Sequence, residues 1–196
     1  MPSHRHFILH KPYGYLSQFV NNQQKRRNKK LLGTLHDFPE GTMSIGRLDE
    51  NSEGLLLLTT NGVVSAQVNS RKVEKEYYVE LDGIITEAAL EQLREGVNIS
   101  TRGSVYKTLA CKAIFLDPAP NFEGGSQKRR DPIHGPTSWA SITISEGKFR
   151  QVRKMTAAVG FPTLRLIRVR VGPIHLQEMA AGEVIEVDGF GFTQFE

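Results

Sequence analysis

A run of four consecutive leucines at residues 55–58 constrains the fold more than any other feature of this sequence. Gly54 precedes the run, and Asn61-Gly62 closes it. A short apolar run that ends at an Asn-Gly turn signal is typical of a buried β-strand. Other segments with apolar or alternating patterns predict strands over residues 6–16, 42–45, 76–81, 105–115, 138–145, 163–171 and 184–187.

Three segments have helical patterns instead. Residues 86–94 form a predicted helix, because Thr86 can cap its first turn and Gly96 lies just past its end. Residues 148–159 carry apolar residues at spacings of three and four, which also predicts a helix. A shorter helix is expected over residues 63–70.

Strands outnumber helices, and most neighbouring strands are joined by hairpin-length connections. This arrangement predicts an α+β fold with a mixed, mostly antiparallel central sheet and flanking helices. We expect a single domain of two lobes over residues 1–196, bisected by a basic cleft. Residues 21–30 and 116–136 lack periodicity and are predicted to be surface loops.

The composition limits the classes of function. Of the 196 residues, 39% are hydrophobic and 23% are charged, as in an ordinary globular protein. No apolar run is long enough to span a bilayer, and the N-terminus lacks a secretory signal, so no membrane partner is expected. Cys111 is the sole cysteine, which excludes a cysteine zinc cluster and favours a reducing cytoplasm. No glycine loop that cradles phosphates and no metal-ligand cluster is found, so neither a cofactor nor a metal is expected.

Positive charge is concentrated in a few segments, although the net charge is only +4. Basic runs occupy residues 25–30, 128–130 and 148–154, and further arginines alternate with apolar residues over 164–170. Such runs are often solvated faces without a partner. Basic faces interleaved with aromatic residues also suit nucleic acid, because cations meet phosphates and rings stack on bases.

The polar loop at residues 46–54, GRLDENSEG, stands just ahead of the leucine strand. A rigid strand can fix such a loop while the loop exposes an acidic side chain, which is a frequent arrangement in enzymes. Asp49 and Glu53 could equally be turn-forming or capping residues. A paired-carboxylate hydrolase is a third reading, and it requires the two acids to face each other across a cleft.

Three separated blocks resemble the RsuA-like family of pseudouridine synthases that modify ribosomal RNA. They are KPYGYL at residues 11–16, GRLDENSEGLLLLTTNG at 46–62, and EGKFRQVRKMTAAVGFPTLRLIRVRVGP at 146–173. The KEYYV segment at 75–79 matches the lysine-x-tyrosine strand of the family. PTSW at 136–139 further resembles the large-subunit type-E members. Together the blocks cover most of the chain in the right order.

The resemblance implies roles for individual residues. Asp49 matches the catalytic aspartate, Tyr77 the tyrosine that stacks on the target base, and Arg153 the arginine that pairs with the aspartate. Leu166 matches the apolar residue beneath the site, with Ile167 as the alternative, and Arg47 lies beside the catalytic loop. An arginine at salt-bridge distance would keep a desolvated carboxylate charged.

The implied partner is ribosomal RNA, of the large subunit rather than the small subunit, bound by a monomer. Many relatives carry an N-terminal S4-like RNA-binding domain, which we expect to be absent here, as in type-E members. The catalytic domain itself would then bind the RNA. The candidate RNA-binding residues are Lys25, Arg26, Arg27, Lys29, Lys30, Lys128, Arg129, Arg130, Arg150, Lys154 and Arg168. A catalytically silent RNA-binding or ribosome-assembly factor is the competing interpretation.

Overall fold

A nine-stranded sheet forms the centre of the protein, in a computed structural model that describes residues 4–20, 28–69, 73–123 and 132–192. The strands run in the order β13-β1-β5-β11-β6-β10-β9, with β4 on β5 and β12 on β11. Within the described ranges, all neighbours in this sheet are antiparallel except β5 and β11. The strands are β1 (His6–Lys11), β4 (Met43–Ile45), β5 (Glu53–Thr59), β6 (Lys75–Asp82), β9 (Lys112–Leu116), β10 (Thr137–Ile144), β11 (Thr163–Val171), β12 (Ile174–His175) and β13 (Val184–Val187).

The leucine run forms the middle of β5, as the sequence predicts, and every residue of this strand is buried. Successive side chains of a strand point to opposite faces. Leu56 and Leu58 therefore join one hydrophobic cluster, and Leu55 and Leu57 join a second cluster on the other face. An uninterrupted leucine run, rather than an alternating one, is what a strand covered on both faces requires.

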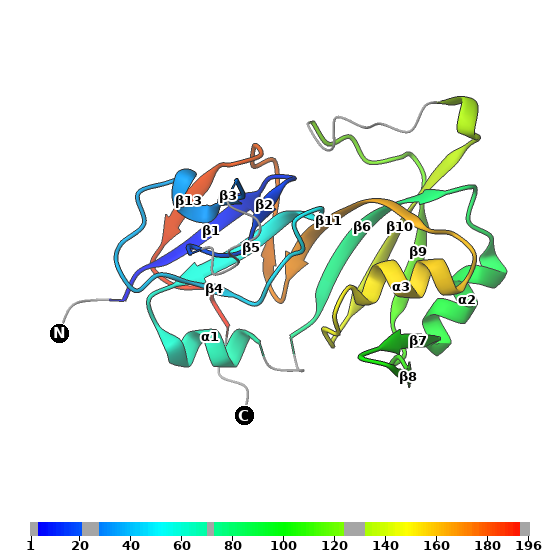
Figure 1. Cartoon of the computed structure of the whole chain (residues 1–196), viewed down its shortest axis with the longest axis horizontal. Helices are drawn as coiled ribbons and strands as arrows, with labels where there is room; N and C mark the ends of the chain where they lie inside the picture. Colours follow the sequence, from blue (N-terminus) through cyan, green and yellow to red (C-terminus); the bar gives the residue numbers. More distant parts are fainter. Residues whose placement is uncertain (1–3, 21–27, 70–72, 124–131, 193–196) are drawn as a thin grey trace.

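The sheet divides where β5 changes partner. Along one edge, β5 pairs with β1 over residues 54–59. Its other edge is shared: Leu57–Thr59 pair with β4, whereas Glu53 and Gly54 alone pair with β11. The β5–β11 contact is therefore only two residues long, and the two halves of the sheet diverge beyond it. Figure 1 shows β1, β5 and β13 in one half and β6, β10 and β9 in the other.

Three α-helices and two short 3-10 turns complete the described part of the chain. Helix α1 (Gly62–Val68) lies beside β4 and β5, and the Asn61 side chain caps it by accepting from two backbone N–H groups. Helices α2 (Glu87–Glu95) and α3 (Gln151–Ala158) cover one face of the β6–β10–β9 half (Figure 1). The 3-10 turns are η1 (Leu32–Thr34) and η2 (Pro132–His134). No helix among the described residues has the length and apolar character to cross a membrane.

The predicted strand over residues 105–115 is wrong, because two strands share this stretch. Strand β8 (Ser104–Lys107) forms a separate hairpin with β7 (Asn98–Thr101), which the sequence did not reveal. The chain then turns, since the Thr108 N–H donates to the Val97 carbonyl and the Cys111 N–H donates to the Arg94 carbonyl. These two bonds fold residues 108–111 against the end of α2 before β9 begins.

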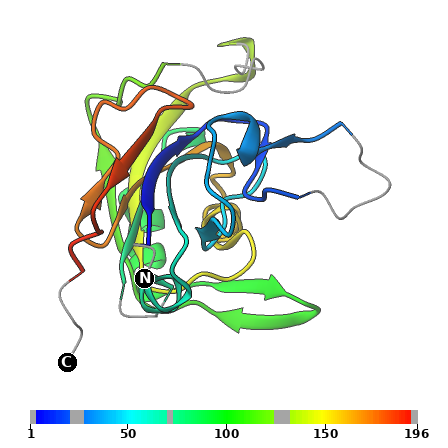
Figure 2. The ribbon, with the colours of Figure 1, turned by 90° about the vertical axis from the view of Figure 1, so that its left-hand side faces the viewer.

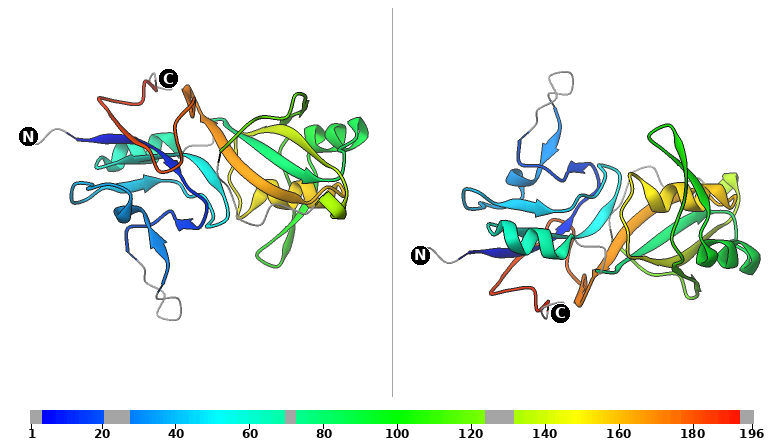
Figure 3. Two further views of the ribbon diagram at one scale, coloured as in Figure 1. Left: turned by 90° about the horizontal axis from the view of Figure 1, so that it is seen from above. Right: turned by 90° about the horizontal axis from the view of Figure 1, so that it is seen from below.

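Two small pairs of strands project from the same side of the molecule. One is the β7–β8 hairpin, and the other is the parallel pair β2 (Tyr15–Leu16) and β3 (Lys30–Leu31). Figure 2 shows both projections on one side of the molecule, and Figure 3 shows them from above and below.

Candidate active site

Five residues that the sequence singles out come together in space. They line one pocket of about 110 Å³ next to the divergence of the sheet: Arg47, Asp49, Tyr77, Arg153 and Leu166. The first two come from the β4–β5 loop, and the others from β6, α3 and β11. The two halves of the sheet therefore both contribute to this pocket.

The loop that carries Asp49 is held from beneath by the N-terminal segment. The Ser17 hydroxyl donates to the Leu48 carbonyl at 2.8 Å and accepts from the Leu48 N–H at 3.0 Å. The Gly14 N–H donates to the carbonyl of Glu50 at 2.8 Å. Leu48 itself is buried in the core. The residues on both sides of Asp49 are thus fixed, and its side chain is left 29% exposed.

A buried lysine maintains the turn of the KPYGYL block. Lys11 is fully buried, and its ammonium donates to the carbonyls of Pro12 and Tyr15 at 2.9 and 2.7 Å. Burial lowers the pKa of Lys11 to about 8. The buried ammonium thus joins the two ends of the turn, and the nearby carboxylates of Glu53, Glu50 and Asp49 partly oppose the effect of burial on its pKa.

The ion pair of Asp49 is not the one that the family resemblance implies. Its Oδ2 accepts from Arg150 Nη1 at 3.4 Å, whereas Arg153 donates to the carbonyls of Asn51 and Thr163 at 2.7 and 3.2 Å. The expected direct Asp49–Arg153 contact is therefore wrong for this structure. Arg153 still lies within electrostatic range of Asp49, although burial is the largest influence on its pKa and lowers it. It instead holds the Asp49 loop through the Asn51 carbonyl.

Arg150 reaches Asp49 because the backbone turns sharply at the start of α3. Its φ of 52° and ψ of 37° place it in the left-handed region, which is uncommon for a residue other than glycine. The predicted helix over 148–159 consequently begins only at Gln151. The Gln151 side chain stabilises the turn: its oxygen accepts from the Lys148 N–H at 2.9 Å, and its nitrogen donates to buried Glu146 at 2.6 Å.

Tyr77 and Leu166 form the apolar wall of the pocket. They lie on adjacent strands β6 and β11 and belong to the same hydrophobic cluster. Ile167 is fully buried on the opposite face, in the second cluster, so the geometry favours Leu166 over the alternative. Tyr78 likewise points away and packs edge-on against Phe122. The Tyr77 ring is the one that lines the site.

Glu53 is held in a buried ion pair and does not face the pocket of Asp49. Its carboxylate is buried and accepts two hydrogen bonds from Arg165, at 3.0 and 2.9 Å. A bidentate pair of this kind leaves little capacity for chemistry on a substrate. The paired-carboxylate hydrolase required Glu53 to face Asp49 across a cleft, and that interpretation is wrong.

The candidate RNA-binding residues divide into several groups. Lys29 is ion-paired with Glu50 of the Asp49 loop at 2.5 Å, while Lys30 is exposed and lies over the Tyr15 ring. Lys154 lies over the exposed Phe149 ring. Arg150, described above, is exposed. The remaining loop candidates fall outside the described residues: Lys25, Arg26, Arg27, Lys128, Arg129 and Arg130.

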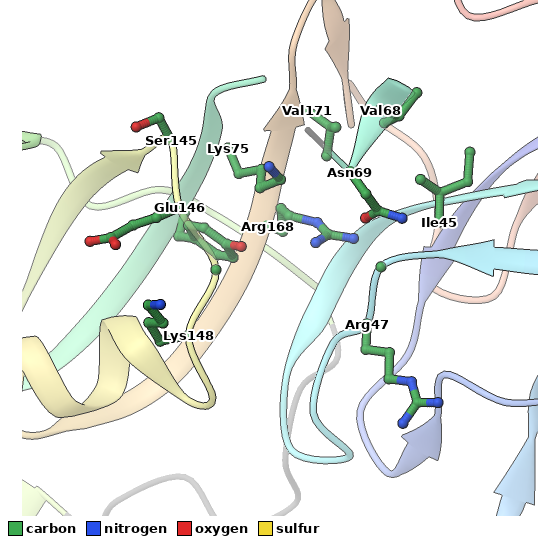
Figure 4. Close-up of a pocket in the computed structure, with 13 residues that line it drawn as sticks. Ile45, Arg47, Val68, Asn69, Lys75, Ser145, Glu146, Lys148, Arg168 and Val171 are labelled. Atoms are coloured by element: carbon green, nitrogen blue, oxygen red, sulfur yellow. The ribbon is translucent and has the colours of Figure 1, made fainter. Parts of the chain in front are cut away.

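The sequence predicts Arg168 on an exposed basic face of β11, and the structure buries it instead. Only 4% of the residue is exposed, and its Nε donates to the Leu55 carbonyl at 2.7 Å. Ile167 interrupts the alternation of basic and apolar residues in β11, so Arg168 lies on the same strand face as Leu166 and Arg165 lies on the opposite face. Arg168 lines a second pocket of about 340 Å³ (Figure 4). This pocket adjoins the Asp49 pocket, and the two share Arg47, Tyr77, Gly147 and Lys148.

Lys75 also lines the second pocket, and residue-by-residue reasoning from the sequence did not select it. The signal was present in the KEYYV segment, where Lys75 stands two residues before Tyr77. Residues i and i+2 of a strand share a face, so a lysine in that position reaches the same cleft as the tyrosine.

Comparisons with known proteins agree on one family for this chain. Residues 5–158 match the family model described as RNA pseudouridylate synthase. A curated relative from Vibrio vulnificus (strain CMCP6), "Ribosomal large subunit pseudouridine synthase E", is 40% identical over 185 residues, covering 92% of this chain and 74% of the relative. A protein of the same name from Xanthomonas axonopodis pv. citri (strain 306) is 38% identical over 177 residues, which cover 88% of each chain.

Solved structures show the same fold. One described as a pseudouridylate synthase superimposes with a TM-score of 0.74 at 28% identity, covering 95% of this chain and 71% of its own. An archaeal box H/ACA Nop10–Cbf5 complex shares the fold at a TM-score of 0.54 and 17% identity, covering 90% of this chain and 50% of its own. With most of its length matched by the family model and by relatives at this identity, the chain belongs to the RNA pseudouridylate synthase family.

Proposed function

We propose that this protein converts a uridine of large-subunit ribosomal RNA into pseudouridine, and that Asp49 is the catalytic carboxylate. The observation that carries the assignment of Asp49 is its placement. It is a partly exposed acid in a rigidly held loop, with a tyrosine ring and three arginines around the same pocket. A silent RNA-binding factor would gain nothing from a carboxylate there, because it repels phosphate.

The reaction needs few groups from the protein. The N1–C1′ bond of uridine breaks, the uracil turns, and a C5–C1′ bond forms; C5 then loses its proton and N1 gains one, so the reaction is an isomerisation with no net change in oxidation state. An anionic oxygen near C1′ and C2′ can serve as nucleophile or as base. The target base must leave its stack at a cost of a few kcal/mol. Stacking on Tyr77 would return roughly 1–3 kcal/mol of that cost.

The large-subunit substrate is inferred from the relatives. Two that cover most of the chain at 38–40% identity are both named for the ribosomal large subunit. We further propose that the enzyme is a monomer and acts on ribosomal RNA in the cytoplasm. Mapping pseudouridine in ribosomal RNA from cells with and without the gene should reveal one lost site in the large-subunit RNA.

Replacement of Asp49 by asparagine tests the catalytic assignment. Asp49→Asn retains the shape of the side chain and removes its charge, so the variant should fold and bind RNA but form no detectable pseudouridine. An amide is neither a nucleophile nor a base at neutral pH. Turnover is measured on transcribed large-subunit RNA with purified protein.

The matched control is Asp188→Asn, which makes the same chemical change at an exposed site that lines neither pocket. It should retain the activity of the unmodified protein. Substantial turnover by Asp49→Asn, or equal loss in both variants, would contradict the assignment of Asp49.

A further inference from the structure

Arg168 differs from the other two arginines of β11 because no acidic side chain among the described residues pairs with it. Arg165 and Arg170 are both ion-paired to glutamate side chains. Arg168 is more buried than either, yet it has no acidic partner among the described residues. Its Nε is satisfied by the Leu55 carbonyl, and the rest of its guanidinium points into the 340 Å³ pocket (Figure 4). A buried cation without a counter-charge is costly unless a ligand supplies one.

A second cation faces the same space. The half-buried ammonium of Lys75 donates to the Val73 carbonyl at 2.9 Å, and no acid pairs with it in the described part of the chain. Burial and the positive charge of Arg168 lower the pKa of Lys75 to about 8. Two like charges held together in a partly desolvated pocket repel each other, so an anion bound between them would be favoured over water.

The acid in the lining of this pocket, Glu146, is already engaged by other groups. The Glu146 carboxylate accepts from the Tyr106 hydroxyl at 2.6 Å, from the Leu109 N–H and from Gln151. Figure 4 shows it directed away from Arg168. Arg47 and Lys148 add positive charge at the boundary that this pocket shares with the Asp49 pocket. The space is therefore electropositive and continuous with the proposed site of chemistry.

We propose that Arg168 and Lys75 form a subsite that binds a backbone phosphate of the RNA strand next to the target nucleotide. This inference rests on the proposed function for the identity of the ligand. A phosphodiester fits both the charge and the position, because a uridine inserted beside Asp49 carries its flanking linkages into the adjoining pocket. The subsite fixes where the strand lies and thereby which nucleotide reaches Asp49.

Lys75→Gln tests the subsite with less risk to folding than a change at buried Arg168. We expect the Kd for a single-stranded ribosomal RNA fragment to rise about tenfold at low salt, as for loss of a charged hydrogen bond. The slope of log K against log salt should fall by about 0.7, the value for one lost phosphate contact with a single strand. Lys75→Arg should restore both quantities, and thermal melting verifies that each variant is folded.

Lys112→Gln is the matched control, because it removes the same charge from an exposed lysine on β9 that lines neither pocket. A thermodynamic cycle completes the test with RNAs in which each linkage near the modified uridine is replaced, one at a time, by a neutral methylphosphonate. At one linkage the effect of Lys75→Gln should disappear. The inference is overturned if Lys75→Gln behaves like Lys112→Gln, or if no neutral linkage abolishes its effect.

The two proposals fail in distinguishable ways. Binding and its salt slope are measured without turnover, so the Lys75 comparison stands even where no pseudouridine forms. Loss of the Lys75 effect with normal turnover would remove the subsite alone. Absence of pseudouridine with an intact Lys75 effect would remove the proposed reaction and leave an RNA phosphate site.

Discussion

Two arginines one helical turn apart face Asp49, and the structure holds them differently. Arg150 is exposed, and its 3.4 Å contact with Asp49 lies in solvent, where ion pairs contribute little. Arg153 donates to the carbonyls of Asn51 and Thr163, and these two bonds join the Asp49 loop to α3 and β11. Its Nε is buried and without a hydrogen-bond partner in the described chain. The side chain of Arg153 is therefore held more rigidly than that of Arg150.

We predict that the two arginines contribute unequally to turnover. Arg153→Gln should lower kcat at least about tenfold, because charge-assisted bonds that position the Asp49 loop are worth roughly 1.5–3 kcal/mol. Arg150→Gln should mainly raise KM, since its exposed charge is available to RNA phosphate. Steady-state kinetics on one RNA fragment separates the two effects. Equal losses of kcat in both variants would contradict the distinction.

Among the elements, the crossing of β5 and β11 determines the position of the cleft. At Gly54 the backbone φ is +103°, and an added Cβ would lie 2.3 Å from the Arg168 carbonyl oxygen. No side chain is accommodated at that distance. The glycine between Glu53 and the leucine run thus permits the two-residue parallel contact that joins the halves of the sheet.

Gly54→Ala should consequently be among the most damaging small changes in the protein. We expect a loss of roughly 4 kcal/mol or more in the free energy of unfolding, because both the backbone angle and the contact with β11 are violated. Urea denaturation followed by circular dichroism measures it. Gly62→Ala is the control: it lies in the first turn of α1 with open space around its Cβ position, so stability should be unchanged or slightly higher. Similar midpoints for the two variants would refute the argument.

In the molecule as a whole, the net charge of +4 conceals an uneven distribution: several cations are paired with acids, and others, without acidic partners in the described part of the chain, gather around one cleft. Two of the β11 arginines are neutralised by glutamates, and Lys29 is paired with Glu50. The cations without acidic partners among the described residues include Arg47, Lys75 and Arg168, around one cleft. The β2–β3 and β7–β8 projections lie on the same side as α3 (Figure 2).

Combined replacement of Lys25, Arg26 and Arg27 by alanine tests how far RNA extends beyond the cleft. If RNA passes along the segment between β2 and β3, affinity should fall and the salt slope should decrease by about 2, or about 0.7 for each lost phosphate contact. Lys29 is left unchanged in this variant because its ion pair holds the Asp49 loop. Fluorescence titrations at several salt concentrations give the slope. A slope equal to that of the unmodified protein would restrict RNA contact to the cleft.

Local sequence patterns predicted the bounds of an element correctly where its own residues specify it. The strand over residues 163–171 has the predicted bounds, and Thr86 caps α2 as expected. The β7–β8 hairpin was missed because its strands are short and half-exposed, and nothing in the segment 105–115 indicates that it bends at 108–111. The late start of α3 was missed because the left-handed conformation of Arg150 depends on Gln151 and buried Glu146.

The sequence by itself determined the class of fold, the family, and five of the residues that line the Asp49 pocket, because strand periodicity and three motif blocks are local properties of the chain. Only the tertiary structure decided how those residues pair. Glu53 binds Arg165, Arg150 rather than Arg153 contacts Asp49, and Arg168 turns inward. The first and third outcomes depend on the short pairing of β5 and β11, strands more than a hundred residues apart, and the second depends on the left-handed turn at Arg150; no local pattern encodes either.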